Sequence, residues 1–248
     1  MGKIKLEAPV YSIESALKAA SCGIDRLELC SNFAEGGETP SAGTLKFLKK
    51  HLNIPIYVMI RPRGGNFVHT TAEIEAMKED ISILSEMGAD GFVFGILTAE
   101  GKLDVKSNSE LIKTAGGKPC TLHRAFDSTR NLNEALIDAI HCGFKRILSS
   151  GGMDNVSEGL NQLLSLLAEA REDIIIMPGG GLDPSHIPYL NREGLLKEVH
   201  ASCKGWRPVK AVYKKPQLSL TKSDSFLTID RDTVSSFQSV LAQFHDPK

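Results

Sequence analysis

The chain alternates segments of two-residue hydrophobic periodicity with segments of helical periodicity, and it does so eight times in succession. Side chains of a strand point alternately to two faces, whereas apolar residues three or four positions apart line one face of a helix. The alternation therefore predicts eight strand–helix units. Their strands are expected at residues 4–7, 25–30, 55–61, 91–97, 119–123, 145–149, 174–177 and 195–200.

Eight such units in 248 residues match the size and order of a (β/α)8 barrel, the TIM barrel. No change in composition marks a boundary, so residues 1–248 are predicted to form a single domain. A doubly wound open sheet is the alternative. The barrel is favoured because the last strand and helix complete an eighth unit, and because several strands alternate polar and apolar residues. An open parallel sheet buried on both faces would show near-continuous apolar runs instead.

Capping residues indicate where several of the predicted helices begin. A Ser, Thr or Asn followed three residues later by Glu can satisfy two free N–H groups of a first helical turn. Three such pairs are expected to open helices: Thr70 with Glu73, Ser107 with Glu110, and Asn131 with Glu134.

Charge and cysteine content argue against several classes of function. A formal net charge of -1 and a pI near 6.7 give no overall attraction to nucleic acid or to an anionic membrane. The five cysteines are odd in number and form no Cys-x-x-Cys pair, which argues against a disulfide framework and a zinc knuckle. No run approaches the length of a membrane span, and no apolar signal core stands at the N-terminus. We expect a cytoplasmic protein that binds neither nucleic acid nor membranes.

The stretch 118–127 (Lys-Pro-Cys-Thr-Leu-His-Arg-Ala-Phe-Asp) brings three chemically active residues to the end of one predicted strand. His123, Arg124 and Asp127 together can bind an anion, transfer a proton or hold a metal. The alternative is structural, with Arg124 paired to Asp127 in a loop and His123 satisfied within the core. In a barrel, the C-terminal ends of the strands meet at one mouth, where active sites are built.

Other predicted strand ends add charged and imidazole groups to the same mouth. Glu28, Arg61 and His200 lie on strand faces that alternation would turn into the barrel. Ionised groups there must be paired, since an isolated buried charge is costly, and an ion-pair network that fixes strand register is the alternative function of these groups. We expect the following residues to line one cavity or its loops and to include the catalytic groups: Glu28, Arg61, His123, Arg124, Asp127 and His200.

A run of three glycines follows the seventh predicted strand. In phosphate-binding barrels, the loops after strands seven and eight supply backbone N–H groups, and glycine lets this backbone approach the anion. Gly179, Gly180 and Gly181, with Ser202 after the eighth strand, are placed correctly to bind such an anion. A tight strand–helix turn explains the glycines equally well.

Sulfur and imidazole side chains near the same strand ends offer ligands for a metal. Cys30, His123 and His200 could converge at the mouth, with Met59 and Cys203 nearby. Thiolate, thioether and imidazole together favour Cu(I) or zinc. A buried Cys is more often a small hydrophobic residue, and Met59 a gap-filling one.

With these residues assembled, the chain resembles the copper homeostasis protein CutC family along nearly its whole length, to about Ser202. The resemblance implies a TIM barrel, a cytosolic location, a soluble homo-oligomer (dimer or tetramer) and a role in copper handling, with Cu(I) bound by cysteine-bearing members. It implies no particular reaction. The segments that carry it are Glu28-Leu29-Cys30, Glu35-Gly36-Gly37, Thr39-Pro40-Ser41, Met59 to Phe67, Gly88-Ala89-Asp90-Gly91, Thr121 to Asp127, Met177 to Gly181 and Glu198 to Ser202.

The chain departs from the family pattern in three places. The first strand reads Glu7-Ala8-Pro9 and lacks the Cys that members often carry two residues after the Glu, which removes one candidate thiolate. Asn66 stands where an Asp is usual, so a possible charge partner for the neighbouring arginines is absent. Residues 203–230 lie beyond the match, are rich in lysine and are long for a βα loop. We expect them to be a lid, an oligomer contact or a disordered stretch.

Two functions follow. In the first, the protein binds Cu(I) in the cytosol through Cys30 and nearby soft ligands and takes part in copper handling or tolerance. In the second, it is a barrel enzyme acting on a small anionic or phosphorylated substrate. Arg61 and Arg124 would then clamp the anion, and His123 or His200 would act as acid or base with Glu28 orienting one of them.

Overall fold

The computed structural model describes residues 2–213, 215 and 225–244, and it contains eight parallel strands in one sheet. The strands are β1 (Lys5–Val10), β2 (Arg26–Leu29), β3 (Ile56–Met59), β4 (Gly91–Phe94), β5 (Cys120–Leu122), β6 (Arg146–Ser149), β7 (Ile175–Pro178) and β8 (Glu198–His200). Neighbouring strands follow the order β7-β6-β5-β4-β3-β2-β1-β8, and β7 also packs beside β8, which nearly closes the sheet. The predicted TIM barrel is confirmed.

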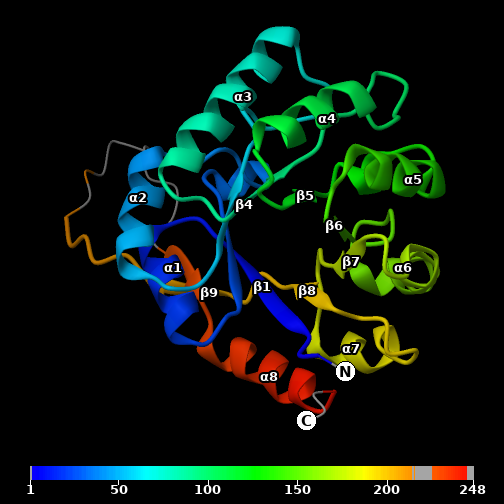
Figure 1. The fold of residues 1–248 in the computed structure, drawn as a ribbon. Coiled ribbons are helices and arrows are strands. Elements are labelled where there is room, and N and C mark those ends of the chain that lie inside the picture. The colour runs from blue at the N-terminus through cyan, green and yellow to red at the C-terminus, as the bar shows by residue number, and fades with distance from the viewer. Residues whose placement is uncertain (1, 214, 216–224, 245–248) are drawn as a thin grey trace.

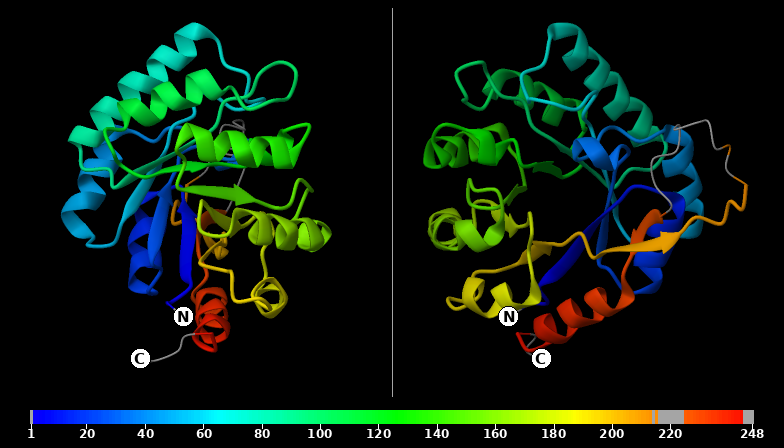
Figure 2. Two further views of the ribbon diagram at one scale, coloured as in Figure 1. Left: turned by 45° about the vertical axis from the view of Figure 1, so that its right-hand side comes forward. Right: turned by 180° about the vertical axis from the view of Figure 1, so that it is seen from behind.

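Helices surround the sheet as a ring (Figure 1). They are α1 (Ile13–Ser21), α2 (Ala42–His51), α3 (Thr71–Glu86), α4 (Val105–Thr114), α5 (Leu132–Cys142), α6 (Val156–Ala170), α7 (Ile187–Leu190) and α8 (Arg231–Ala242), with 3-10 turns η1 (Phe33–Glu35), η2 (Phe126–Ser128) and η3 (Pro184–His186). A view turned by 45° and a view from behind also show the helices around the strands (Figure 2). Within the described ranges, none of these helices has the length and apolarity needed to cross a membrane.

The alternation of strand side chains separates an outer core from the barrel interior. On β2, Leu27 and Leu29 are fully buried among the residues that pack the helices onto the sheet. Arg26 and Glu28, on the opposite face of the same strand, are buried too, although they are charged. The interior also holds a small sulfur-bearing apolar group made of Cys30, Tyr57, Met59 and Val93. The expected polar lumen is therefore present.

Of the three expected capping pairs, one is complete and a second is present through its first residue. Thr70 and Glu73 form the expected box at α3, and the Asn131 side chain accepts N–H groups at the start of α5. The expectation for α4 was wrong, because Asp104 caps it. The Asp104 carboxylate accepts both the N–H and the hydroxyl of Ser107, so the helix begins one turn before the expected pair.

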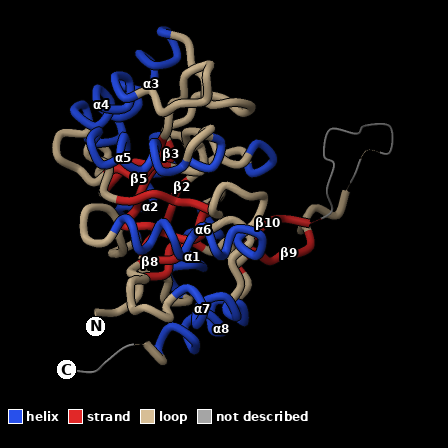
Figure 3. Tube along the Cα trace, turned by 90° about the vertical axis from the view of Figure 1, so that its right-hand side faces the viewer, coloured by secondary structure: helices blue, strands red, loops and turns tan. Residues whose placement is uncertain are grey.

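Residues 203–230 contain structure that the sequence interpretation missed. Strand β9 (Lys204–Pro208) pairs in antiparallel fashion with β10 (Ser225–Ile229), and this hairpin projects from one side of the barrel (Figure 3). The two ends of this segment therefore pair with each other, and β10 packs on α1. Residues 214 and 216–224 lie outside the described residues, so the expected lid or disordered stretch is not addressed there.

Candidate functional site

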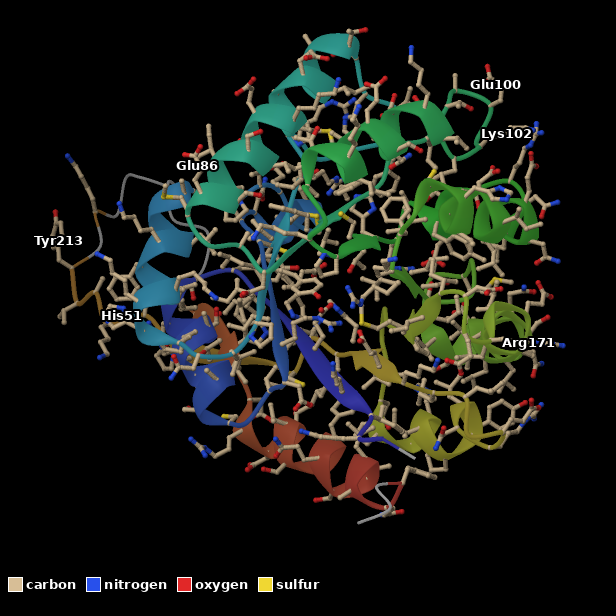
Figure 4. All side chains as sticks on the ribbon, in the orientation of Figure 1. His51, Glu86, Glu100, Lys102, Arg171 and Tyr213 are labelled. Atoms are coloured by element: carbon tan, nitrogen blue, oxygen red, sulfur yellow. The ribbon has the colours of Figure 1, made fainter. Side chains whose placement is uncertain are left out.

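The centre of the barrel holds a network of buried ion pairs. The parallel register places Glu7 of β1 opposite Arg26 of β2 and also opposite His200 of β8. The Arg26 guanidinium binds the carboxylates of Glu7 and Glu198, and Arg146 Nε lies 3.0 Å from the same Glu198. Nitrogen and oxygen atoms accordingly lie in the middle of the ring of helices (Figure 4). Each of these charges is paired, as burial requires.

His200 links this network to a second glutamate. Its Nδ1 lies 2.9 Å from Glu7 Oε1, and its Nε2 lies 3.7 Å from Glu28 Oε2. The other oxygen of Glu28, Oε1, is buried and has no hydrogen-bond partner among the described residues. The imidazole therefore stands between two carboxylates, one tied into the ion-pair network and one partly free.

The pKa values of Glu7, Glu28 and His200 are shifted in different directions. Burial opposes ionisation of Glu7, but Arg26 and His200 outweigh it and lower the pKa of Glu7 to about 2. For Glu28, burial outweighs the attraction of His200 and raises the pKa to about 7. Burial alone would lower the pKa of His200, but the two carboxylates raise it above the usual value. At neutral pH, Glu7 is therefore ionised and Glu28 is poised to gain or lose a proton, and the two carboxylates favour the protonated form of His200.

A cavity of about 320 Å³ lies over this triad at the C-terminal mouth, and we call it the mouth cavity. It is large enough for a small metabolite. The structure brings most of the sequence-predicted site residues into its wall, together with Tyr11, Glu35, Gly36, Met59, Phe67 and Leu148. The predicted residues that line it are Glu28, Arg61, His123, Arg124, Gly180, Gly181, His200 and Ser202.

Three predicted residues are not part of the cavity wall. Cys30 is buried behind it, beside Met59. Gly179 lies at the seam between β7 and β8, where a Cβ atom would approach His200 Cβ to 2.9 Å, so this glycine permits strand packing. Asp127 accepts hydrogen bonds from Arg124 and from the Ser149 and Ser150 hydroxyls. The Asp127 carboxylate therefore holds the loop after β6 in place.

Arg61, one of the two predicted clamp arginines, is held by backbone carbonyl groups of two loops. The Arg61 guanidinium donates to the carbonyl oxygens of Glu35, Gly37 and Gly65, which ties together the loops after β2 and β3. Its Nε is buried without a partner among the described residues, and its Cζ lies 5.0 Å from the Phe67 ring centroid. These contacts fix the Arg61 guanidinium in the wall of the mouth cavity, where it supplies positive charge.

His123 is a buried, uncharged imidazole. Its Nδ1 accepts the N–H of Ala125 at 3.2 Å, and its ring centroid lies 4.9 Å from that of Phe67. Burial, helped by the nearby charge of Arg61, lowers the pKa of His123 to about 3. Because Nδ1 accepts, the neutral ring carries its proton on Nε2 and can donate a hydrogen bond from there, but it does not carry charge at neutral pH.

This lowered pKa predicts a pH dependence of stability. Below pH 6.5 this histidine binds a proton in the unfolded chain, whereas in the folded chain it stays neutral down to about pH 3. The contribution of His123 to the free energy of unfolding therefore falls as pH falls. The raised pKa of Glu28 makes its own contribution to stability increase as pH falls over part of this range. Comparing the parent with His123→Gln removes the Glu28 contribution, which both proteins share. From pH 6.5 to 4.5, we expect the difference in unfolding free energy, parent minus variant, to decrease by about 1.4 kcal/mol per pH unit.

Urea denaturation at intervals of half a pH unit measures this difference. His51→Gln, the same change at an exposed histidine on α2, serves as the control for the substitution itself. A difference for His123→Gln that stays flat with pH would contradict a buried neutral imidazole.

Metal-ligand geometry favours a different trio from the predicted one. Among the described residues, the group of three that brings His, Cys, Asp or Glu ligand atoms within 4.8 Å of one another is Glu7, Glu28 and His200. Cys30, His123 and His200 do not form such a group. Carboxylate oxygens and an imidazole nitrogen suit zinc or Cu(II) better than Cu(I). Burial also raises the pKa of the Cys30 thiol well above its usual value, with help from Glu28 and Glu7, so the thiolate is disfavoured.

The fold and the mouth cavity define a TIM-barrel protein with a polar cavity at the place where barrel enzymes build their active sites. The CutC family model matches residues 4–205, and the chain belongs to the CutC family. It is 38% identical over 218 residues to the copper homeostasis protein cutC homolog of Homo sapiens, covering 88% of this chain and 80% of that one. The homolog of Drosophila melanogaster is 43% identical over 202 residues, covering 80% and 77%.

A solved structure of a putative copper homeostasis protein CutC from Streptococcus agalactiae has the same fold. It matches with a TM-score of 0.75 at 33% identity, and the match covers 80% of this chain and 98% of that chain. The part of this chain beyond the family match begins at residue 206, within the β9–β10 hairpin.

Proposed function

We propose that this protein is an enzyme that transfers protons to and from a small anionic substrate held in the mouth cavity. The observation that carries the proposal is Glu28, a carboxyl group that lines the cavity and whose buried Oε1 has no hydrogen-bond partner among the described residues. Its pKa, raised to about 7, lies where a general acid or base is most effective at neutral pH. A carboxyl placed only to fix strand register would have both oxygens paired.

The neighbouring groups support proton transfer by Glu28. His200 is hydrogen-bonded to the ionised Glu7 and lies 3.7 Å from Glu28. When protonated, it stabilises the carboxylate form of Glu28, which is the form that accepts a proton. His123 offers a neutral hydrogen-bonding group in the same cavity, and Arg61 offers a fixed positive charge. Together they provide a base, a polar orienting group and charge compensation for an anion.

Solvent exchange tests this function even though the substrate is unidentified. A panel of small hydroxy acids, oxo acids and sugar phosphates is incubated with the protein in ²H₂O, and ¹H NMR detects loss of carbon-bound protons and any new product. We expect at least one compound to exchange or turn over, with a rate that changes around pH 7. If no compound in the panel exchanges or is converted, the proposal of a proton-transfer enzyme on such substrates fails.

A second candidate function is copper handling, in which a cytosolic homo-oligomer binds Cu(I). The printed names of the human and fly relatives describe copper homeostasis. In this chain, two sulfur-bearing side chains pack around Gly37: Cys30 Sγ and Met59 Cε lie 3.4 and 3.5 Å from the position of a Cβ there. Thiolate and thioether are ligands that Cu(I) prefers.

Cu(I) binding, if this candidate is right, should depend on Cys30. We expect Cys30→Ser to weaken Cu(I) binding at least tenfold in competition with a colorimetric Cu(I) chelator, because a hydroxyl is a poor ligand for this ion. Cys142→Ser, a change at a buried cysteine of α5 away from the mouth cavity, is the matched control and should keep the parent affinity. Equal affinities for all three proteins would remove Cys30 from any copper site.

A further inference from the structure

The loop after β7 brings two consecutive glycines, Gly180 and Gly181, to the wall of the mouth cavity. Gly180 and Gly181 have φ angles of 93° and 75°, a left-handed conformation that favours glycine. Neither N–H has a hydrogen-bond partner among the described residues, whereas the Gly180 carbonyl accepts the N–H of Val156 at 2.8 Å and so anchors the loop. Successive free N–H groups in such a turn form a concave site for an anion.

Arg124 lies directly against this turn. A Cβ atom on Gly180 would lie 3.0 Å from both Cζ and Nη1 of Arg124, so only a glycine lets the guanidinium approach so closely. Arg124 Nε binds Asp127 at 2.8 Å, and Nη2 binds the Ser150 hydroxyl at 2.7 Å. Nη1 has no partner among the described residues. The guanidinium is therefore held in position with one edge available.

Further features show that the cavity beside this turn is a built site. Glu28 and Arg61 are each more than nine-tenths buried, and both line the cavity that Gly180 and Gly181 also line. One side-chain atom of each, Glu28 Oε1 and Arg61 Nε, has no hydrogen-bond partner among the described residues. Ser202, after β8, adds a hydroxyl to the same wall. The cavity thus has available donors on the loops after β5, β7 and β8, and it borders Glu28, whose buried Oε1 is unsatisfied among the described residues.

We propose that the Gly180–Gly181 turn, Arg124 and Ser202 form a binding site for the phosphate group of a small phosphate monoester. The inference rests on the proposed function and adds the substrate class and its orientation, with the phosphate at this turn and the reacting end toward Glu28. Two N–H groups, a guanidinium edge and a hydroxyl offer at least four donors. The three terminal oxygens of a phosphate can accept them all, whereas a carboxylate has two.

Calorimetric titration tests the site with inorganic phosphate, glycerol 3-phosphate and glycerate as probes. The parent should bind both phosphate compounds and bind glycerate more weakly. Gly180→Ala should weaken phosphate binding at least tenfold, because the added methyl displaces Arg124 and strains the turn. The matched control is Gly117→Ala, since Gly117 also has a positive φ, 87°, but has no atom within 4 Å of its Cβ position and lies outside the cavity.

Arg124→Gln should weaken phosphate binding about 10- to 100-fold, the loss expected for a charged hydrogen bond. Arg124 also holds the loop after β6, so a loss of binding could come from a changed loop. Arg124→Lys, which keeps the positive charge, is therefore measured as well and should recover part of the affinity. Thermal unfolding of both variants is recorded. Glu28→Gln should still bind glycerol 3-phosphate, which separates this site from the proton-transfer proposal.

Each outcome decides the proposal. Weakened binding in Gly180→Ala and Arg124→Gln, with Gly117→Ala unchanged, supports the site. Absence of phosphate binding by the parent overturns it, as do equal affinities in all variants or tighter binding of glycerate than of glycerol 3-phosphate. Each of these last results would leave the solvent-exchange test of proton transfer unaffected.

Discussion

Replacing Glu28 with glutamine is expected to slow the conversion of the protein's substrate by about 10²–10⁴-fold, the usual contribution of a general acid or base. Glutamine keeps the shape of the side chain and can hydrogen-bond to His200, but it cannot take up or release a proton. The change should also abolish the dependence of the rate on an ionisation near pH 7, because the pKa of Glu28, about 7, is its source.

The measurement is the rate of proton exchange or turnover of the compound identified in the solvent-exchange screen, followed across pH 5.5–8.5 for parent and variant. Glu86→Gln, at the exposed end of α3 on the rim of the molecule, is the control and should match the parent (Figure 4). A Glu28→Gln protein that retains both the rate and the pH profile would show that another group transfers the proton.

Replacing Arg26 with methionine is expected to lower the free energy of unfolding by about 3–5 kcal/mol, the cost of leaving buried charges without a partner. Arg26 is 3% exposed, binds Glu7 and Glu198 at once, and lies over the Tyr57 ring at 4.7 Å. Methionine fills a similar volume, so the loss comes from the two carboxylates rather than from a void. The pKa of Glu7 should also rise, since Arg26 is the main group that lowers it.

Urea denaturation at pH 7 measures the loss for Arg26→Met. Arg192→Met is the matched control, because Arg192 is exposed and its nearest ion pair, with Glu193, is 3.8 Å long. This control should change the unfolding free energy by no more than about 0.5 kcal/mol. A loss below about 1 kcal/mol for Arg26→Met would mean that the interior carboxylates find other partners, or protons, when the arginine is absent.

The barrel could be predicted because its signals are local. The faces of β2 follow from the alternation of Leu27 and Leu29 with Arg26 and Glu28, and the eight units follow from where this pattern gives way to helical periodicity. Polar residues at strand ends also predicted that these side chains would meet at one end of the barrel. His123, Arg124 and His200 reach one cavity because parallel strands all end at the same mouth.

What could not be predicted depends on contacts between distant segments. Asp127 is a catalytic candidate from its neighbours in the sequence, which also allow a local pair with Arg124. The contacts of its carboxylate with the loop after β6, 22 and 23 residues further along the chain, had no signal in the sequence. The importance of Arg26 arises from Glu198, 172 positions away. In the sequence, only the alternation on β2 indicated that Arg26 would point into the barrel. The β9–β10 hairpin was missed because no tight-turn signal joins its two strands.

The aromatic residues at the rim of the barrel have a practical consequence. Tyr11, in the wall of the mouth cavity, contacts the Phe33 ring at 5.2 Å between centroids, and Phe33 in turn faces Trp206 of the hairpin at 6.3 Å. Trp206 is the single tryptophan of the chain and is half exposed. Its fluorescence therefore comes from one known place, two rings away from the cavity. The chain thus carries its own optical probe for the occupancy of that cavity.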